Sequence, residues 1–466
     1  MPEVAYSPRL RSGVVLCGVG TAGAYQAGAL RALSEAGIKV DVVAAHGAGV
    51  LTALAAAVDG GARLWDPATG PWTDRRLRRA YRWRTALRLG MAGLAAALVV
   101  LVLPLIVLVV AAAVYVASLL AALVNLTAVS SNLVEWYRWA IETLFSPPML
   151  PTIVPRTIVL VLLAIAAVLA VAGVQAIRSE RSRRRVAGAF WWRLLGSPLD
   201  AAEPRATLVE ALWGLVRGAS AAPRPAAAEI GRRYVDVLAD NFGQPGFHEV
   251  LVAVHDLDGR RDLVGAVLAG PARAAFEART RGGPPRGAEI VDFTGPQRDL
   301  IADFLVGSLC LPLANEPHVL RFPAESYWRG ERHRVCDRPE IVARLIDELA
   351  NVGVEQVILV SPAPPAAGPY GIRARPLGLR ARFGEIVRSI ETAALQDAYA
   401  AAATRFSGVF VIRPAHNPIG PFDFAGTYDE GSDRRRTVEE LMAQGYADAY
   451  RLFIEPVVAA GEREAG

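Results

Sequence analysis

A glycine-rich turn near the N-terminus has the composition of an anion-binding loop. It separates an apolar run from a helical pattern and consists of Gly18, Val19, Gly20, Thr21, Ala22 and Gly23. Glycine allows positive φ angles and close approach to the backbone. Free N–H groups at the start of the following helix would stabilise a bound anion, or the oxyanion that develops during acyl transfer.

A second turn of small residues follows the next apolar run. It consists of Ala45, His46, Gly47, Ala48 and Gly49. A strand, a tight turn and a helix are the setting of a nucleophile elbow, which presents a reactive side chain above a sheet. Position 47, where an elbow carries its nucleophile, is a glycine and has no nucleophilic atom. His46 stands beside it, but a lone histidine is more often structural than catalytic.

The apolar pattern predicts the elements that hold these turns. Strands at 13–17 and 40–45 alternate with helices at 24–36 and 50–58. This βαβα order predicts a parallel sheet with helices on its faces. The same pattern resumes later in the chain, with strands predicted at 250–255, 354–360 and 409–412 and helices at 299–305, 340–350 and 385–404.

Two long segments without charge interrupt the α/β pattern. The first covers 89–134 and is almost wholly apolar over 89–124, and the second covers 157–177. A bilayer core requires about 20 apolar residues, so we expect both to span a membrane as a hairpin. Arginines gather in 75–88 and 178–193. The positive-inside rule then predicts a multi-pass membrane protein with its α/β domain on the cytoplasmic side.

The amino-acid composition excludes several classes of protein. Of the 466 residues, 53% are hydrophobic and 20% charged, which excludes a disordered chain. Three widely spaced cysteines exclude a disulfide framework, and the histidines lack metal-ligand spacing. We therefore expect no metal and no other cofactor. The basic runs flank apolar segments, so membrane lipid is the expected partner and nucleic acid is not.

The two turns and the helix between them resemble the patatin-like phospholipase family. The resemblance is carried by 17–30, which includes the sequence AYQAG, and by 42–49. It continues in weaker form through 252–260 (VAVHDLDGR), 304–312 (FLVGSLCLP), 327–330 (YWRG) and 337–339 (DRP). It implies a patatin-like α/β fold interrupted by the membrane hairpin. The expected parts are 1–74 and 229–466 for that domain, 75–195 for the membrane insertion and 196–228 for a linker.

The resemblance also implies site residues. In the family, the glycine-rich loop forms an oxyanion hole, and an elbow serine works with an aspartate in a D-G-G or D-G-A motif. The corresponding positions here are Gly47 and Arg329. A guanidinium stays protonated and cannot act as a general base. Ser308 corresponds to a non-catalytic serine of the family and is expected to cap or pack locally, and Asp256 and Asp258 are expected to stabilise a turn.

Three functions remain open. The first is a membrane-anchored pseudoenzyme of lipid metabolism, which binds a phospholipid or acyl ligand or acts in regulation without hydrolysis. The second is an active lipid acyl hydrolase with a non-standard nucleophile. The third is a nucleotide-binding membrane protein using the glycine-rich turn, but His46 stands where a ribose-binding acid is required. The missing dyad favours the first. Arg413 and 434–436 are further candidates for lipid phosphates, with solvated surface as the alternative.

Overall fold

The chain divides into two units. A computed structural model describes residues 6–66, 70–74, 76–144, 146, 153–178, 196–218, 220, 222–278, 286–368 and 378–465. The first unit comprises Met1–Arg82 and Leu199–Gly466, and the second comprises Trp83–Pro198. The second unit is therefore inserted into the first, with bounds that differ from the expected 75 and 195. Two short strands lie at these junctions, β3 (Arg82–Trp83) and β4 (Leu199–Asp200).

A mostly parallel sheet of nine strands forms the centre of the first unit. The strands are β1 (Ser12–Leu16), β2 (Val42–Ala45), β5 (Glu249–Asp256), β6 (Arg261–Val267), β7 (Ile290–Asp292), β8 (His318–Arg321), β9 (Arg332–Cys336), β10 (Gln356–Val360) and β11 (Gly408–Ile412). The order is β11-β10-β1-β2-β5-β6-β7, and β9 pairs with β5 and β8. The five strands from β11 to β5 are parallel, whereas β6 and β9 run antiparallel to β5. The predicted α/β class is confirmed.

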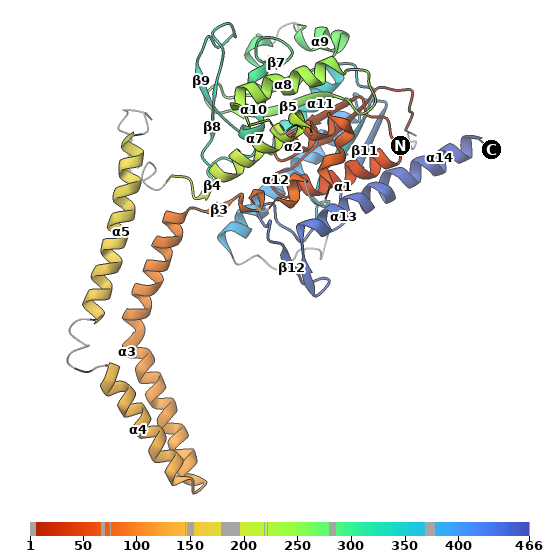
Figure 1. The fold of residues 1–466 in the computed structure, drawn as a ribbon. Helices are drawn as coiled ribbons and strands as arrows, with labels where there is room; N and C mark the ends of the chain where they lie inside the picture. Colours follow the sequence, from red (N-terminus) through yellow and green to blue (C-terminus); the bar gives the residue numbers. More distant parts are fainter. Residues whose placement is uncertain are drawn as a thin grey trace. The chain divides into compact units, whose positions relative to one another are not determined.

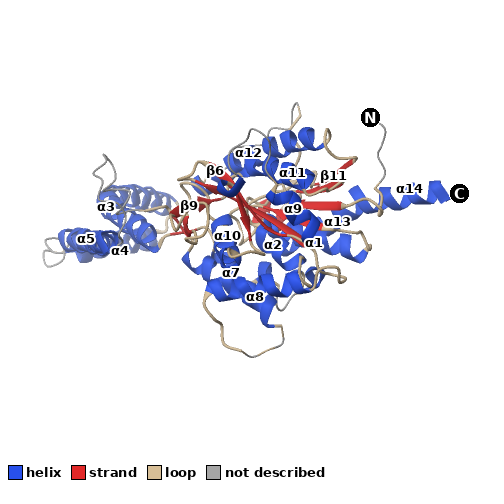
Figure 2. Cartoon of the chain, turned by 90° about the horizontal axis from the view of Figure 1, so that it is seen from above, coloured by secondary structure: helices blue, strands red, loops and turns tan. Residues whose placement is uncertain are grey.

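Helices cover both faces of this sheet, which is why β1 and β2 are buried along their whole length. The helices are α1 (Ala22–Glu35), α2 (Gly49–Ala56), α7 (Ala202–Arg217), α8 (Ala227–Asp240), α9 (Gly270–Glu277), α10 (Ile301–Ser308), α11 (Val342–Asn351), α12 (Leu379–Ala402), α13 (Val438–Ala449) and α14 (Glu455–Ala465). Figure 2 shows α11 and α12 on one side of the sheet and α1, α2, α7 and α8 on the other. Strands β12 (Thr427–Asp429) and β13 (Arg434–Arg436) form a separate hairpin.

The expected linker at 196–228 is wrong over its central part. Helix α7 occupies Ala202–Arg217, and Leu208, Leu212 and Trp213 on it are buried. Leu208 and Leu212 are four residues apart and so lie on the same face of the helix, and Trp213 directly follows them. Burial of that apolar face holds the segment in the α/β unit, so only the residues between α7 and α8 remain as a connection.

Among its described residues, the second unit contains the helices α3 (Thr85–Leu123), α4 (Thr127–Leu144) and α5 (Ile153–Arg178). Helix α5 lies beside the first half of α3, and α4 lies beside the second half, where Tyr137 Oη donates to the carbonyl of Val107 at 2.8 Å (Figure 1). The 39 residues of α3 extend for about 58 Å, roughly twice the thickness of a bilayer core. Each half of α3 therefore has its own helical partner.

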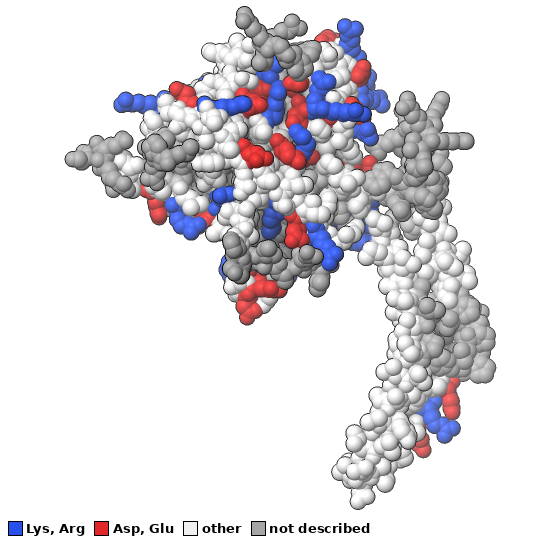
Figure 3. Space-filling model, turned by 180° about the vertical axis from the view of Figure 1, so that it is seen from behind, with Lys and Arg blue, Asp and Glu red and all other residues white. Residues whose placement is uncertain are grey.

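Among the described residues, one segment is long and apolar enough to span a membrane, Leu105–Leu123 within α3. The apolar parts Thr85–Ala96 and Thr157–Val171 are shorter. The predicted two-span hairpin is therefore not shown and stays a prediction. On the face drawn in Figure 3, the surface of this unit is nearly free of charge apart from a group in α4, where Arg138 and Glu142 pair. Arg75 and residues 179–195, part of the predicted basic flanks, lie outside the described residues.

Candidate functional site

The two glycine-rich turns meet at the carboxyl ends of β1 and β2. Strand β2 ends at Ala45 and α2 begins at Gly49, so Gly47 lies in the tight turn between them with a φ of +60°. The N–H of Ala48 donates to the carbonyl of Gly18 at 3.0 Å. A Cβ atom on Gly47 would lie 2.5 Å from that same carbonyl oxygen. The turn has the shape of an elbow, but its apex has no room for a side chain.

The residue opposite Gly47 is Asp337, and the expectation for Arg329 is corrected. Asp337 is fully buried, and its Oδ2 lies 2.9 Å from the position of a Cβ on Gly47. It directly follows β9, which reaches the site because its last residue, Cys336, pairs with His255 of β5. Arg329 lies in an exposed turn before β9, with a φ of +46°. The guanidinium of Arg329 is solvated in this exposed turn. The buried site instead contains the carboxylate of Asp337, whose charge requires a buried partner.

That partner is His46, which is 1% exposed. Its Nδ1 donates to Oδ1 of Asp337 at 3.1 Å. Burial lowers the pKa of His46, but the charge of Asp337 and the hydrogen bond to it raise the pKa overall to about 10. The imidazole is therefore charged at neutral pH and forms a buried ion pair. Within the described part of the chain, Nε2 of His46 and Oδ2 of Asp337 have no hydrogen-bond partner.

A second carboxylate occupies the glycine-rich turn. The N–H of Val19 donates to Oε1 of Glu391 in α12 at 2.8 Å. Burial raises the pKa of Glu391 to about 7, although this N–H and the charge of His46 both lower it. The donor that would stabilise an oxyanion is thus already bonded to an internal carboxyl group.

The rest of the turn is covered by neighbouring segments. The N–H of Thr21 donates to the carbonyl of Pro421 at 3.0 Å, and its hydroxyl donates to the carbonyl of Gly420 at 3.2 Å. Ala22 and Gly23 form the first turn of α1, and the ring of Trp72 packs where a Cβ on Gly23 would lie. The cavity beside Val19 and Glu391 measures about 10 Å³. This volume holds one water molecule at most and has no room for an acyl chain or a pyrophosphate.

The other residues singled out in the sequence have local roles. The Ser308 hydroxyl donates to the carbonyl of Leu305 at 2.9 Å, as expected of a structural serine. Asp256 accepts the N–H groups of Asp258 and Gly259 and so stabilises the turn after β5. No group of three or more His, Cys, Asp or Glu side chains within the described ranges is placed to hold a metal ion.

This arrangement has the outline of an acyl-transfer site without its reactive parts. Position 47 supplies no hydroxyl, Asp337 is committed to His46, and Val19 is committed to Glu391. What remains is a buried cluster of one imidazole and two carboxylates. The sequence motif DRP singled out Asp337 but did not indicate that it lies opposite Gly47. No local sequence pattern indicated a role for Glu391, because it lies inside a regular amphipathic helix.

The His46–Asp337 pair predicts a pH dependence of stability. The pKa of His46 in the folded protein lies above its ordinary value of 6.5. The pair therefore contributes fully below pH 6.5, and its contribution is lost as the pH rises toward 10. We expect the free energy of unfolding to fall across this window by at most about 1.4 kcal/mol per pH unit. Thermal unfolding of the wild type and His46→Gln between pH 6.5 and 10 measures this effect. Equal slopes for the two proteins would contradict the assignment.

Comparison with known proteins places few constraints on this site. No family model matches the chain, and no curated protein matches it. Among solved structures, the chain is similar to VipD from Legionella pneumophila, with 13% sequence identity over 96% of this chain and 67% of that chain. The TM-score is 0.32, and at this level the similarity carries no argument about fold or function.

Proposed function

We propose that this chain is a non-hydrolytic, patatin-like membrane protein, in which the elbow and the glycine-rich turn serve structure or regulation instead of catalysis. The observation that carries the proposal is the hydrogen bond from the N–H of Val19 to Glu391, beside an elbow whose apex is Gly47. An internal carboxyl group takes the place of the reaction's oxyanion, and the elbow position itself supplies no attacking atom.

Acyl transfer by a covalent route needs a nucleophile, a base that activates it and donors for the developing oxyanion. Gly47 provides no nucleophile. Asp337 holds a charged imidazole, so a nucleophile introduced nearby would meet an ion pair instead of a free base. Protonation of Glu391 could release the N–H of Val19, but the first two parts would still be missing.

The helical unit supports a location at a lipid membrane. Large apolar side chains of α3 are exposed along Leu105–Leu123, among them Leu108 at 66% and Leu120 at 60%. An exposed apolar surface of this extent is stable in a hydrocarbon environment and unfavourable in water. We therefore propose a membrane anchor in 83–198, with the two spans near 89–124 and 157–177 and the α/β unit on the cytoplasmic side.

A fluorophosphonate probe tests the absence of catalysis. We expect purified full-length protein to take up no probe and to release no fatty acid from phosphatidylcholine or p-nitrophenyl butyrate. A known serine esterase added to the same sample confirms that the probe is active. Labelling of a serine, abolished when that serine is changed to alanine, would establish the hydrolase alternative and overturn the proposal.

The same preparation tests the membrane part of the proposal. We expect full-length protein in phosphatidylcholine vesicles to stay with the vesicles after an alkaline carbonate wash. An integral helix is held by about 20 buried apolar residues, whereas a peripheral protein is released. Recovery of the protein in the supernatant would contradict the anchor and would leave the conclusion on catalysis unaffected.

A further inference from the structure

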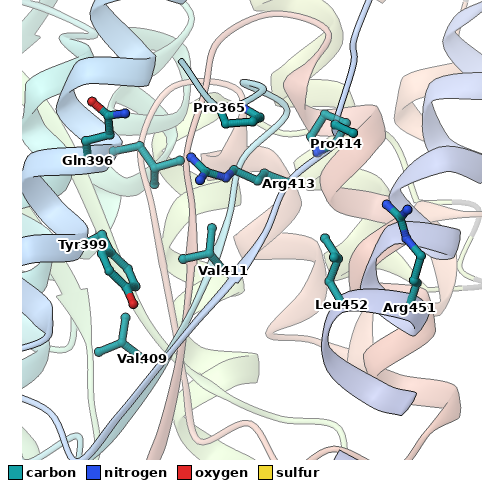
Figure 4. A pocket seen from close by; sticks show the side chains of 11 residues that line it. Pro365, Gln396, Tyr399, Val409, Val411, Arg413, Pro414, Arg451 and Leu452 are labelled. Atoms are coloured by element: carbon teal, nitrogen blue, oxygen red, sulfur yellow. The ribbon is translucent and has the colours of Figure 1, made fainter. Parts of the chain in front are cut away.

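A groove lies along the edge of the central sheet, two strands away from β1. It runs beside β11, between α12 and the turn Tyr450–Ile454, and has a volume of about 660 Å³ (Figure 4). Sites for small molecules commonly have volumes of about 300–1,000 Å³. The groove is thus large enough for a ligand, in contrast to the cavity beside the glycine-rich turn.

The groove is polar at one end and apolar at the other. Figure 4 shows Gln396 and the guanidinium of Arg413 at one end, with Val411 below them and Tyr399 and Val409 at the opposite end. The parallel edge strand explains this arrangement. Val409 and Val411 point to the same face of β11, and Arg413 continues that alternation just beyond its last residue.

Arg413 is the charged group that this groove leaves without a counterion. Its guanidinium has no hydrogen-bond or ion-pair partner among the side chains and backbone atoms that the structure describes. The other arginine of the groove, Arg451, is paired with Asp448 at 2.8 Å. A half-buried guanidinium beside apolar walls attracts a carboxylate or phosphate, to which it can donate two parallel hydrogen bonds.

We propose that this groove binds an amphiphile with a carboxylate or phosphate head and an apolar chain. The head pairs with Arg413, and the side-chain amide of Gln396 is placed to donate to it. The chain lies along Val411, Val409 and the ring of Tyr399. This site is separate from the elbow, so the proposal stands whether or not the elbow hydrolyses anything. The ligand has two possible sources, a free fatty acid or an anionic phospholipid of the membrane.

Photocrosslinking of full-length protein in phosphatidylcholine nanodiscs tests the proposal. The probe is palmitate with a diazirine in its chain, and tandem mass spectrometry maps the labelled residues. We expect label on β11, α12 or the turn Tyr450–Ile454, displaced by palmitate and by hexadecyl phosphate but not by hexadecanol. We expect Arg413→Gln to weaken binding about tenfold or more, because it removes a charged hydrogen-bond pair. Arg224→Gln, a change at an exposed arginine between α7 and α8, should leave binding unchanged.

A second variant distinguishes a loss of ligand binding from a folding defect. Val409→Trp fills the apolar end and should abolish labelling while the thermal midpoint and circular dichroism stay near those of the wild type. Nanodiscs containing phosphatidic acid distinguish the two sources: suppression of labelling by that lipid identifies a membrane lipid, whereas suppression by added palmitate alone identifies a free fatty acid. Equal displacement by hexadecanol, or unchanged labelling of Arg413→Gln, would overturn the proposal.

Discussion

A serine introduced at position 47 is expected to destabilise the protein and to produce no esterase activity. Its Cβ would lie 2.5 Å from the carbonyl oxygen of Gly18 and 2.9 Å from Oδ2 of Asp337. Backbone oxygens cannot move aside as the end of a flexible side chain can. The positive φ of +60° costs a non-glycine residue about 1–3 kcal/mol, and overpacking costs about 1–3 kcal/mol more. Thermal unfolding and p-nitrophenyl butyrate hydrolysis measure the two effects.

Gly37 offers a matched control for this substitution. It also has a positive φ, of +67°, but a Cβ there would meet nothing within 4 Å. Gly37→Ser therefore measures the backbone cost alone, and the difference between the two variants measures the contact at the elbow. Equal destabilisation of both proteins, or ester hydrolysis by Gly47→Ser, would show that the elbow has room for a nucleophile and would contradict the occluded site.

Asp337→Ala is expected to lower the free energy of unfolding by about 3–5 kcal/mol. The change removes the charge and the hydrogen bond that raise the pKa of His46, so burial leaves this 1% exposed imidazole neutral and without its partner. The interaction lost is that of a buried ion pair, and removing one of its members costs about this much. Asp337→Asn keeps an acceptor for Nδ1 and should cost less. Chemical denaturation followed by tryptophan fluorescence, with the double variant His46→Gln/Asp337→Asn, gives the coupling energy of the pair.

The pair of His318 and Asp303 is the matched control. Its Nε2 and Oδ1 atoms are 2.7 Å apart, but the two side chains are 20% and 36% exposed. An exposed pair contributes about 0–1 kcal/mol, so Asp303→Ala should have a small effect. Similar losses for Asp337→Ala and Asp303→Ala would mean that burial does not control the energy of the His46–Asp337 pair.

The part of the site made by local sequence could be predicted. The positions of Gly18–Gly23 and of Gly47 follow from glycine and from short apolar runs, signals contained within about 15 residues. Strands β1 and β2 and helices α1 and α2 were therefore expected within a few residues of their observed bounds. A glycine indicates the backbone conformation at its own position, and this indication does not depend on contacts made elsewhere in the chain.

The two carboxylates of the site depend on contacts far apart in the sequence. Asp337 reaches Gly47 only because β9 pairs with β5, and Glu391 reaches Val19 only because α12 packs against one side of the sheet. The resemblance led to Arg329, eight residues too early. A local signal for β9 existed, since exposed Arg332 and Arg334 alternate with buried His333 and Val335. Such alternation over five residues indicates a strand but not its partner.

The position of the inserted unit has a consequence for synthesis on the ribosome. Strand β2 ends at Ala45 and its parallel neighbour β5 begins at Glu249, with Trp83–Pro198 between them. At about 5–20 residues per second, the nascent chain would carry β1 and β2 for roughly 10–40 s before β5 emerges. Strand β10, on the other side of β1, arrives later still. During that interval the largely apolar pair of β1 and β2 lacks the strand on either side of it, so yield should depend on chaperone capacity.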